Sequence, residues 1–150
     1  MSIIKKGFTL IELLVVISII SILIALGSTS YQRAVRLSRD SKRKTDLEQL
    51  RQALEIYRSE NGVYPLGINA NASVNNNPFT TALVGGGFIS SIPEDPKYNS
   101  YYYRYRKTGS HTTYSLCATL EIDPEQTLVN CSGQSCGTGS LACNYEVTNP

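Results

Sequence analysis

Hydrophobic and polar positions divide the chain into stretches of different character. Residues 8 to 26 form an apolar run that carries one charged side chain, Glu12. As a helix the run would be about 28 Å long, close to the roughly 30 Å hydrocarbon layer of a membrane. Farther along, four residues recur at spacings of three and four, which predicts one buried face of a helix: Leu47, Leu50, Leu54 and Tyr57.

We expect a single helix to run from Phe8 to about Asn61. Asn61-Gly62 is typical of a helix end, and Pro65 follows soon after it. Inside this helix, residues 27 to 30 (Gly-Ser-Thr-Ser) are four modest helix formers in a row. They predict a bend or local melting at this point.

The second half of the chain predicts a small antiparallel sheet. Residues 66 to 92 are rich in Asn and Gly and predict a long irregular connection. Residues 100 to 106 and 112 to 121 alternate as strands do, with a turn at 107 to 110, and residues 127 to 131 are a candidate third strand. One face of the second strand is apolar: Tyr114, Leu116, Ala118 and Leu120. The predicted fold class is α+β, a long N-terminal α-helix (transmembrane in its first half) packed on a small antiparallel β-sheet head.

The basic residues are concentrated in the segment that follows the apolar run. The net charge of +2 is too small to indicate nucleic acid, and we predict no specific nucleic-acid partner. Residues 38 to 46 (SRDSKRKTD) are polar all round, which favours a solvated helical face over a basic surface for acidic neighbours or DNA. The rule that basic residues stay inside would place this side of the apolar run in the cytoplasm, because six basic residues follow the run: Arg33, Arg36, Arg39, Lys42, Arg43 and Lys44.

The four cysteines all lie in the last 34 residues, with the spacing C-x13-C-x4-C-x6-C. This spacing fits a zinc site poorly, whereas an even count behind an export-type segment favours disulfides and an oxidising compartment. Three pairings are open. Short loops and local strand pairing favour Cys117–Cys131 and Cys136–Cys143.

Three interpretations of the N-terminal segment compete. It is a secretory signal peptide cut after Gly27, a plain anchor, or a leader cut between Gly7 and Phe8 that leaves the apolar run on the mature chain. Glu12 favours the third, because a carboxylate in a bilayer costs roughly 2.5–3.5 kcal/mol and usually has a partner. Cleavage would free the amine of Phe8 four residues before this acid, on the same helix face. Glu12 can then pair with its own terminus or with that of a neighbouring subunit.

Residues 5 to 16, "KKGFTLIELLVV", resemble the N-terminus of type IV pilins and of the pseudopilins of type II secretion systems. The resemblance implies the pilin fold, cleavage after Gly7 by a prepilin peptidase, N-methylation of Phe8, and a role for Glu12 in filament assembly. It implies as partners other copies of the chain, the membrane, the peptidase, and an inner-membrane assembly platform with its ATPase. The chain would start as a single-pass protein of the inner membrane and end in an extracytoplasmic filament, with Lys5 and Lys6 on the cytoplasmic side.

We expect no catalytic residue and no cofactor. His111 is the one histidine, no Ser/His/Asp set can be assembled around it, and the sequence holds no phosphate-binding loop. Calcium is the alternative, because major pseudopilins carry a calcium loop near the position of Glu121, Asp123 and Glu125. The acidic C-terminal tail of those proteins is missing here, since the last 20 residues hold one acid, Glu146.

The best hypothesis is therefore a structural subunit of a type IV pilus or a type II secretion pseudopilus, not an enzyme. One alternative is a secreted binding domain with an ordinary signal peptide, and another is a minor pilin that primes or caps the filament. The expected organisation has five parts: a leader at 1–7, a membrane and filament-core helix at 8–27, an amphipathic helix at 28–62, a loop at 63–97, and a disulfide-bonded β head at 98–150.

Overall fold

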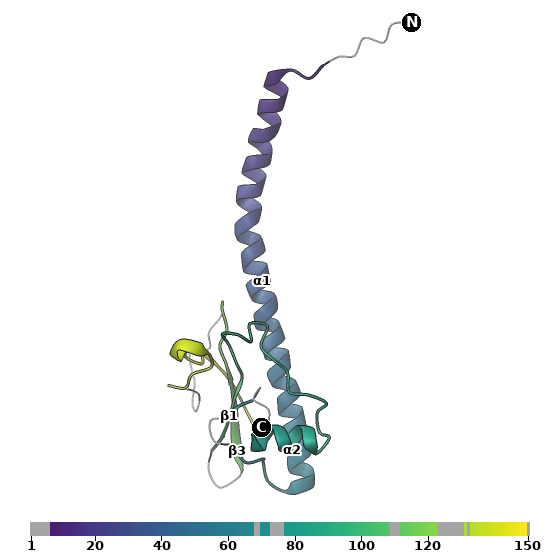
Figure 1. Ribbon diagram of the computed structural model, residues 1–150, viewed down its shortest axis with the longest axis vertical. Helices are drawn as coiled ribbons and strands as arrows, with labels where there is room; N and C mark the ends of the chain where they lie inside the picture. Colours follow the sequence, from purple (N-terminus) through teal and green to yellow (C-terminus); the bar gives the residue numbers. More distant parts are fainter. Residues whose placement is uncertain are drawn as a thin grey trace, which may run out of the picture. The chain divides into compact units, whose positions relative to one another are not determined.

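A computed structural model of the chain describes residues 7–67, 70–72, 77–108, 112–122, 131 and 133–149 (Figure 1). The chain forms two compact units, Met1–Arg36 and Leu37–Pro150. The first holds the N-terminal part of the long helix. The second, called the head here, holds the rest of that helix and everything after it.

The long helix α1 runs over Leu10–Asn61, 52 residues, close to the predicted bounds. It ends where expected, because the backbone N–H of Gly62 donates to the carbonyl of Arg58 at 2.8 Å. Gly62 has a φ of +75°, the left-handed conformation that closes helices. Residues 27–30 are helical in this single chain, so the expected local melting there is absent. The hydroxyl of Thr29 contributes by donating to the carbonyl of Leu26 at 3.3 Å.

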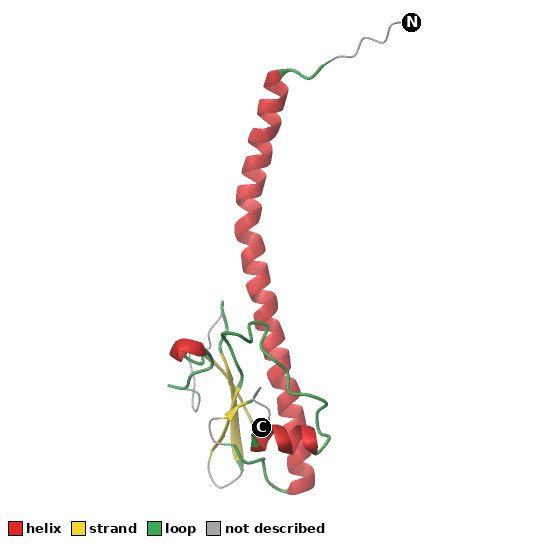
Figure 2. Ribbon diagram, viewed as in Figure 1, coloured by secondary structure: helices red, strands yellow, loops and turns green. Residues whose placement is uncertain are grey.

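The head contains a four-stranded antiparallel sheet in the order β1-β2-β3-β4, which confirms the α+β prediction (Figure 2). The predicted hairpin is β2 (Arg104–Thr108) and β3 (Thr113–Ala118), with Tyr105 opposite Leu116. The turn was predicted from residue 107, but residues 107 and 108 belong to β2. Residues 109–111 and most of the candidate strand at 127 to 131 lie outside the described residues. β1 (Ala70–Asn71) and β4 (Tyr145–Thr148) complete the sheet, and neither was predicted.

The connection between α1 and the sheet is less irregular than expected. It contains β1 and a second helix, α2 (Pro78–Gly85). Asn77 caps α2, because its side-chain oxygen accepts from the N–H of Thr80 at 2.7 Å. Pro78 fits the first turn, where no backbone donor is needed. The Asn-Pro pair is thus the signal that this part of the connection is helical.

The core of the head lies between the C-terminal half of α1, α2 and the inner face of the sheet. The predicted stripe supplies the α1 side, since Leu47, Leu50 and Leu54 are fully buried. Tyr57 is half-buried at the edge, where its ring meets that of Phe88. Across from this stripe the core is filled by side chains from α2 and the sheet: Phe79, Leu83, Tyr103, Tyr105, Tyr114 and Leu116.

The buried tyrosines tie the sheet to α1 through their hydroxyl groups. Tyr103 donates to Asp46 at 2.7 Å, and Tyr114 donates to Glu55 at 3.0 Å. A buried phenol needs such a partner, because an unpaired hydroxyl in the core is costly. Burial first, and then the hydrogen bond to Asp46, raise the pKa of Tyr103 far above its ordinary value of 10.0. The phenol therefore stays a neutral donor.

A buried ion cluster centred on Arg43 joins α1 to two later segments. The Arg43 side chain is fully buried, and its guanidinium donates to Asp40 at 2.7 Å and to Glu121 at 3.0 Å. Two further bonds, 2.7 and 3.0 Å long, reach the two oxygens of Asp95. Asp40 in turn accepts the backbone N–H groups of Glu121 and Ile122. One guanidinium thus holds three carboxylates from three parts of the chain.

This cluster corrects the prediction of a solvated face over residues 38 to 46. Asp40, Arg43 and Asp46 are buried, and they continue the apolar stripe of α1 toward its N-terminus. Their spacing of three is compatible with one helix face, but a buried face was not predicted because the side chains are polar. Burial is tolerated because each charge meets an opposite charge or a hydrogen-bond partner.

We predict that Arg43→Met lowers the free energy of unfolding of the head by about 3–5 kcal/mol. Removing one partner of a buried ion cluster leaves the other charges uncompensated. Urea unfolding of the detergent-solubilised chain, followed by tyrosine near-UV circular dichroism, measures the effect. Arg51→Gln is the matched control, because Arg51 pairs with Glu48 on the surface, and it should cost less than about 1 kcal/mol. Equal losses in the two variants would contradict the role given to the cluster.

We predict that the head loses stability as the pH falls below about 4.5. Hydrogen bonds from Arg39 above all, then from Lys97 and Arg43, hold the pKa of Glu121 far below its ordinary value of 4.5, against the opposing effect of burial. In acid the unfolded chain therefore takes up a proton at Glu121 before the folded chain does, with a slope of up to about 1.4 kcal/mol per pH unit.

The test compares urea midpoints across this pH range for the natural chain and for Glu121→Gln. The variant should be less stable at neutral pH and should lose less stability on acidification. An identical pH dependence in both chains would show that Glu121 is not the responsible group.

Candidate functional site

The predicted cleavage position lies before the start of α1. Gly7 and Phe8 are in no helix or strand, and α1 begins only at Leu10. Both residues are exposed, with the Phe8 side chain 87% accessible. A side chain added at Gly7 would meet nothing within 4 Å. The Gly7–Phe8 peptide bond is thus free of helical hydrogen bonds and sterically open. Residues 1–6, including Lys5 and Lys6, lie outside the described residues.

Thr9 and Glu12 form a reciprocal cap at the start of α1. The backbone N–H and the hydroxyl of Thr9 both donate to Oε2 of Glu12, at 2.8 and 2.7 Å. The backbone N–H of Glu12 donates back to the Thr9 hydroxyl at 3.3 Å. This is a capping box, whose signature Thr-x-x-Glu is present in the sequence and was missed. It explains why the helix begins at Leu10 and not at Phe8.

Glu12 has a hydrogen-bond partner in the uncleaved chain as well, and not only the amine that cleavage would free. In the uncleaved chain the nitrogen of Phe8 belongs to a peptide bond, and Glu12 already has Thr9 as a partner. A carboxylate at this end of a helix is also favoured by the helix dipole. Pairing of Glu12 with a free Phe8 amine stays a prediction. Residues 8 and 12 do share one shallow groove, which Ile11, Val15 and Val16 also line.

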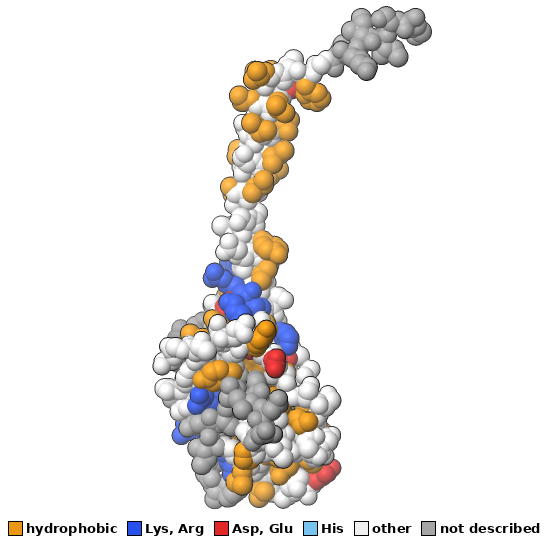
Figure 3. Space-filling view, in the orientation of Figure 1, with side chains coloured by type: hydrophobic (Ala, Val, Ile, Leu, Met, Phe, Trp, Pro, Cys, Tyr) orange, Lys and Arg blue, Asp and Glu red, His pale blue; other side chains and the backbone are white. Residues whose placement is uncertain are grey.

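The N-terminal part of α1 exposes an unusually large apolar surface. Every large hydrophobic side chain from Phe8 to Leu26 is at least 47% exposed. Figure 3 shows hydrophobic side chains gathered along this part of the helix. By length and composition α1 can cross a membrane. Since apolar patches of this size are not left in water, lipid or other protein must cover the segment.

Polar groups inside the apolar segment are satisfied within the helix. The hydroxyl of Ser18 donates to the carbonyl of Leu14 at 2.8 Å, and that of Ser21 donates to the carbonyl of Ile17 at 2.7 Å. Groups in a bilayer need such internal partners, because the lipid offers none. The segment is therefore compatible with a hydrocarbon environment along its length, with Glu12 as its one charge.

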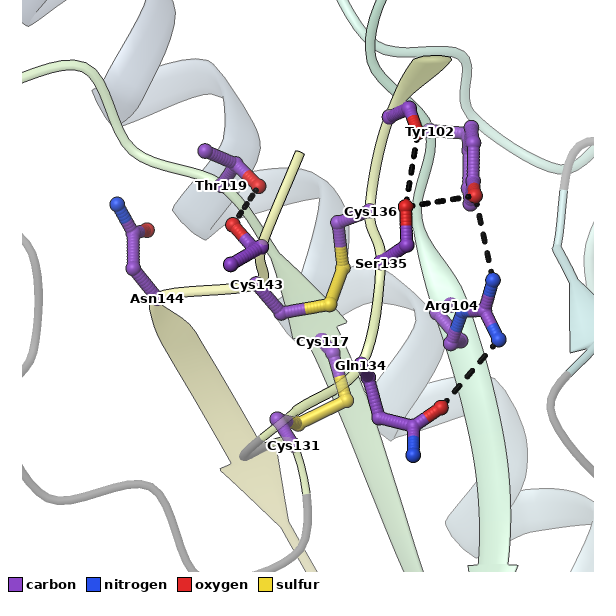
Figure 4. Close-up of a disulfide and its surroundings, with 12 residues drawn as sticks. Tyr102, Arg104, Cys117, Thr119, Cys131, Gln134, Ser135, Cys136, Cys143 and Asn144 are labelled. Atoms are coloured by element: carbon purple, nitrogen blue, oxygen red, sulfur yellow. Dashed lines mark hydrogen bonds between the residues drawn. A yellow bond between two sulfur atoms is a disulfide. The ribbon is translucent and has the colours of Figure 1, made fainter. Parts of the chain in front are cut away.

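Two disulfides fasten the C-terminal segment of the head (Figure 4). They join Cys117 to Cys131 and Cys136 to Cys143, the pairing that the loop lengths favoured. Cys117 belongs to β3, and the four half-cystines form one buried cluster. Each bond contributes about 2–3 kcal/mol if its effect is to restrict the unfolded chain.

Polar contacts hold the same segment on the sheet. As Figure 4 shows, Arg104 lies between Tyr102 and Gln134, donating to the Tyr102 hydroxyl at 3.2 Å and to the Gln134 side-chain oxygen at 3.4 Å. Thr119 donates to the carbonyl of Ala142 at 2.8 Å. These hydrogen bonds join the C-terminal segment to neighbouring parts of the same chain. Together with the two disulfides, they give this segment a structural role in the head.

The residues considered for calcium and for catalysis do not form a site in the described part of the chain. Glu121 accepts hydrogen bonds from Arg39, Arg43 and Lys97. Its carboxylate is therefore already neutralised by three cations and does not fit a calcium ligand. Asp123, Glu125 and His111 lie outside the described residues. Within the described ranges, no three His, Cys, Asp or Glu side chains gather as a metal site would require.

Two protein families match the chain, one over the head and one over the N-terminus. The family described as "Type II secretion system (T2SS), protein G" matches residues 31–123. The motif described as "Prokaryotic N-terminal methylation motif" matches residues 4–28, which include the open Gly7–Phe8 bond and the Thr9–Glu12 cap. A comparison with solved structures found no significant match.

Individual proteins agree with the family matches. The type II secretion system core protein G of Vibrio cholerae is 34% identical over 146 residues, 95% of this chain and 93% of that protein. The protein of the same name from Escherichia coli K12 is 30% identical over 75% of this chain and 79% of its own length. The fimbrial protein EcpC of Eikenella corrodens is 37% identical over 59% of this chain and 54% of its own length. The chain belongs to the type II secretion system protein G family.

Proposed function

We propose that the chain is a structural subunit of a type II secretion pseudopilus and not an enzyme. It enters the inner membrane through the apolar part of α1, with the head on the extracytoplasmic side. A prepilin peptidase cuts it after Gly7 and methylates the new amine of Phe8. An assembly platform and its ATPase then draw the subunit into a filament, where the same apolar segment packs against other copies.

The observation that carries this proposal is the boundary at residues 7–10. An open peptide bond is followed directly by a capped helix, and that helix exposes its apolar side chains along the next 17 residues, 10 to 26. Cleavage there removes the leader without disturbing the helix. The helix that remains has an apolar surface that needs a cover, which lipid provides first and neighbouring subunits provide later.

The helix also speaks against an ordinary signal peptide cut after Gly27. Gly27 lies inside α1, with helical residues on both sides. Proteolysis requires an extended backbone, so a cut there would need several helical turns to unwind. The Gly7–Phe8 bond needs no unwinding. The structure therefore favours retention of the apolar segment.

The pseudopilus is favoured over the type IV pilus by how much of the chain each kind of relative matches. Proteins named type II secretion core protein G match along most of the chain, including the head. The fimbrial protein EcpC matches little more than half of it. The longer match to the secretion proteins therefore favours the pseudopilus. Whether the subunit is the major component or a minor one that primes or caps the filament is decided by its abundance in sheared filaments.

We predict that cells with a prepilin peptidase convert the chain to a form that starts with N-methyl-Phe8. Gly7→Leu should block this conversion, because the added side chain projects next to the scissile bond. Gly27→Leu is the matched control and should be processed normally, because Gly27 lies far along α1 from the scissile bond and an added Cβ there meets nothing within 4 Å. Intact-mass spectrometry distinguishes the products. A mature chain that starts at Ser28 would overturn the proposal.

We predict that Glu12→Ala leaves membrane insertion and cleavage intact but abolishes filament assembly. In a filament the Phe8 amine of one subunit would lose its anionic partner, and an unpaired buried charge costs about 3–5 kcal/mol. That loss weakens each subunit contact more than about 100-fold. Filament yield after shearing, set against the amount of processed subunit in membranes, measures the effect.

Glu12→Gln separates the two roles of this side chain. Glutamine can keep the capping hydrogen bonds with Thr9, but it carries no charge. If charge pairing drives assembly, Glu12→Gln fails as Glu12→Ala does, although its helix still begins at Leu10. Normal filaments from Glu12→Gln would assign the effect to the cap and refute the charge role.

A further inference from the structure

The six basic residues that follow the apolar run differ in whether the head engages their side chains. Four of the six are engaged within the head. Arg39 and Arg43 bind Glu121, and Lys42 binds Asp46 at 2.8 Å. Lys44 lies over the ring of Tyr145, 5.3 Å from its centre. Arg39, Lys42 and Arg43 are thus paired with carboxylates of the head, and Lys44 contacts an aromatic ring of the head.

Arg33 and Arg36 are the two basic residues of this group that stay unpaired. Both are exposed on α1, and neither side chain has a hydrogen bond or an ion pair with any other described residue. They are three positions apart, so they lie on one helix face and repel each other. Tyr31, two residues before Arg33, is 72% exposed. Two cations and an aromatic ring thus project from one short stretch of helix.

The helical rise places this stretch at the membrane surface. If the segment ending at Leu26 spans the hydrocarbon layer, Tyr31 lies about 8 Å beyond it, Arg33 about 10 Å and Arg36 about 15 Å. The headgroup layer is roughly 5–8 Å thick on each side. Tyr31 therefore reaches the level that interfacial aromatic residues prefer. The arginine side chains are long enough to bend back toward the phosphate groups.

We propose that Arg33 and Arg36 bind the phosphate groups of anionic phospholipids in the leaflet from which α1 emerges, while Tyr31 lies at the same interface on another face of the helix. Charge complementarity selects this partner. Parallel copies in one bilayer would bring arginine next to arginine at this depth. In the described part of the N-terminal unit the one acid is Glu12, which lies at the other end of the apolar run. Lipid phosphates are the anions available at the right level.

This inference rests on the proposed function, because it needs a chain that spans a bilayer. It adds that the unassembled subunit selects its lipid neighbours. The bound headgroups neutralise the two like charges and fix how far α1 emerges from the membrane. Assembly would then have to separate the subunit from these lipids, in addition to removing its apolar surface from the hydrocarbon layer.

The test uses the full chain reconstituted in vesicles of phosphatidylcholine with a minor fraction of phosphatidylglycerol. Spin-labelled versions of the two lipids report which one is immobilised at the protein surface. We expect a preference for phosphatidylglycerol of about five-fold per arginine for a lipid in contact, because each basic group near the surface contributes about that factor. High salt should reduce it.

The double variant Arg33→Gln, Arg36→Gln should lose this preference. Glutamine keeps the helix, since its helix propensity is similar to that of arginine. The matched control is Arg106→Gln, Lys107→Gln, which removes the same charge from β2 of the head and should keep the preference. A preference that persists in the double variant, or that is absent from the natural chain, overturns the inference.

Two further readouts separate the remaining outcomes. Resistance to alkaline extraction from the vesicles reports whether the chain spans the bilayer. If the chain is extracted, the proposed function fails along with the inference. If it stays inserted without a lipid preference, only the inference fails. Energy transfer between labelled copies that changes in the double variant, without a change in lipid preference, would assign the arginines to a second copy of the chain and reject the lipid site.

Discussion

The buried guanidinium of Arg43 is the contact on which the head depends. It holds Asp40 on the same helix, Asp95 in the connection before the sheet, and Glu121 in the segment after β3. These three carboxylates would repel one another and destabilise the fold if the cation were missing. An isolated salt bridge on the surface could not do this, since it contributes little. The cluster therefore fixes how the helix, the connection and the sheet meet.

The same cluster determines which charges stay available outside the head. Arg39 and Lys97 complete the neutralisation of Glu121, so a segment that is strongly basic in the sequence contributes few free cations. The basic residues of this group whose side chains have no such partner among the described residues are Arg33 and Arg36, on the part of α1 closest to the apolar run. In the proposed topology this segment lies on the extracytoplasmic side, where an oxidising compartment allows the two disulfides to form. Charge counts from a sequence overstate the free charge wherever such a cluster forms.

An element could be predicted from the sequence when the residues that determine it lie close together in the chain. The apolar run, the stripe Leu47, Leu50 and Leu54, and the hairpin of β2 and β3 depend on periodicity within one segment, and they were predicted. The disulfide pairing followed from short loops. α2 was missed because its cap, Asn77, lies in a polar stretch that looked irregular, although the local signal was present.

Other features could not be predicted because their causes are distant in the sequence. The burial of Asp40, Arg43 and Asp46 depends on Asp95, Glu121 and Tyr103, which lie some 50 to 80 residues away. β1 has two residues, too short a stretch for alternation to reveal. For such elements the partner strand or the opposite charge decides the structure, and a single segment cannot show it.

Glu12 shows how one side chain can serve a helix and an assembly without conflict. Both hydrogen bonds from Thr9 end on Oε2, so within the described residues Oε1 accepts none. The cap therefore uses one carboxylate oxygen and leaves the other for a cation. Before cleavage the acid is stabilised by its own helix, which reduces the cost of holding it in lipid. After cleavage an amine, of the same subunit or of a neighbour, can bind the free oxygen while the cap stays in place. A carboxylate that is already oriented by its cap loses little conformational freedom when that amine arrives, so under the proposed function the capping box would prepare the charge for assembly.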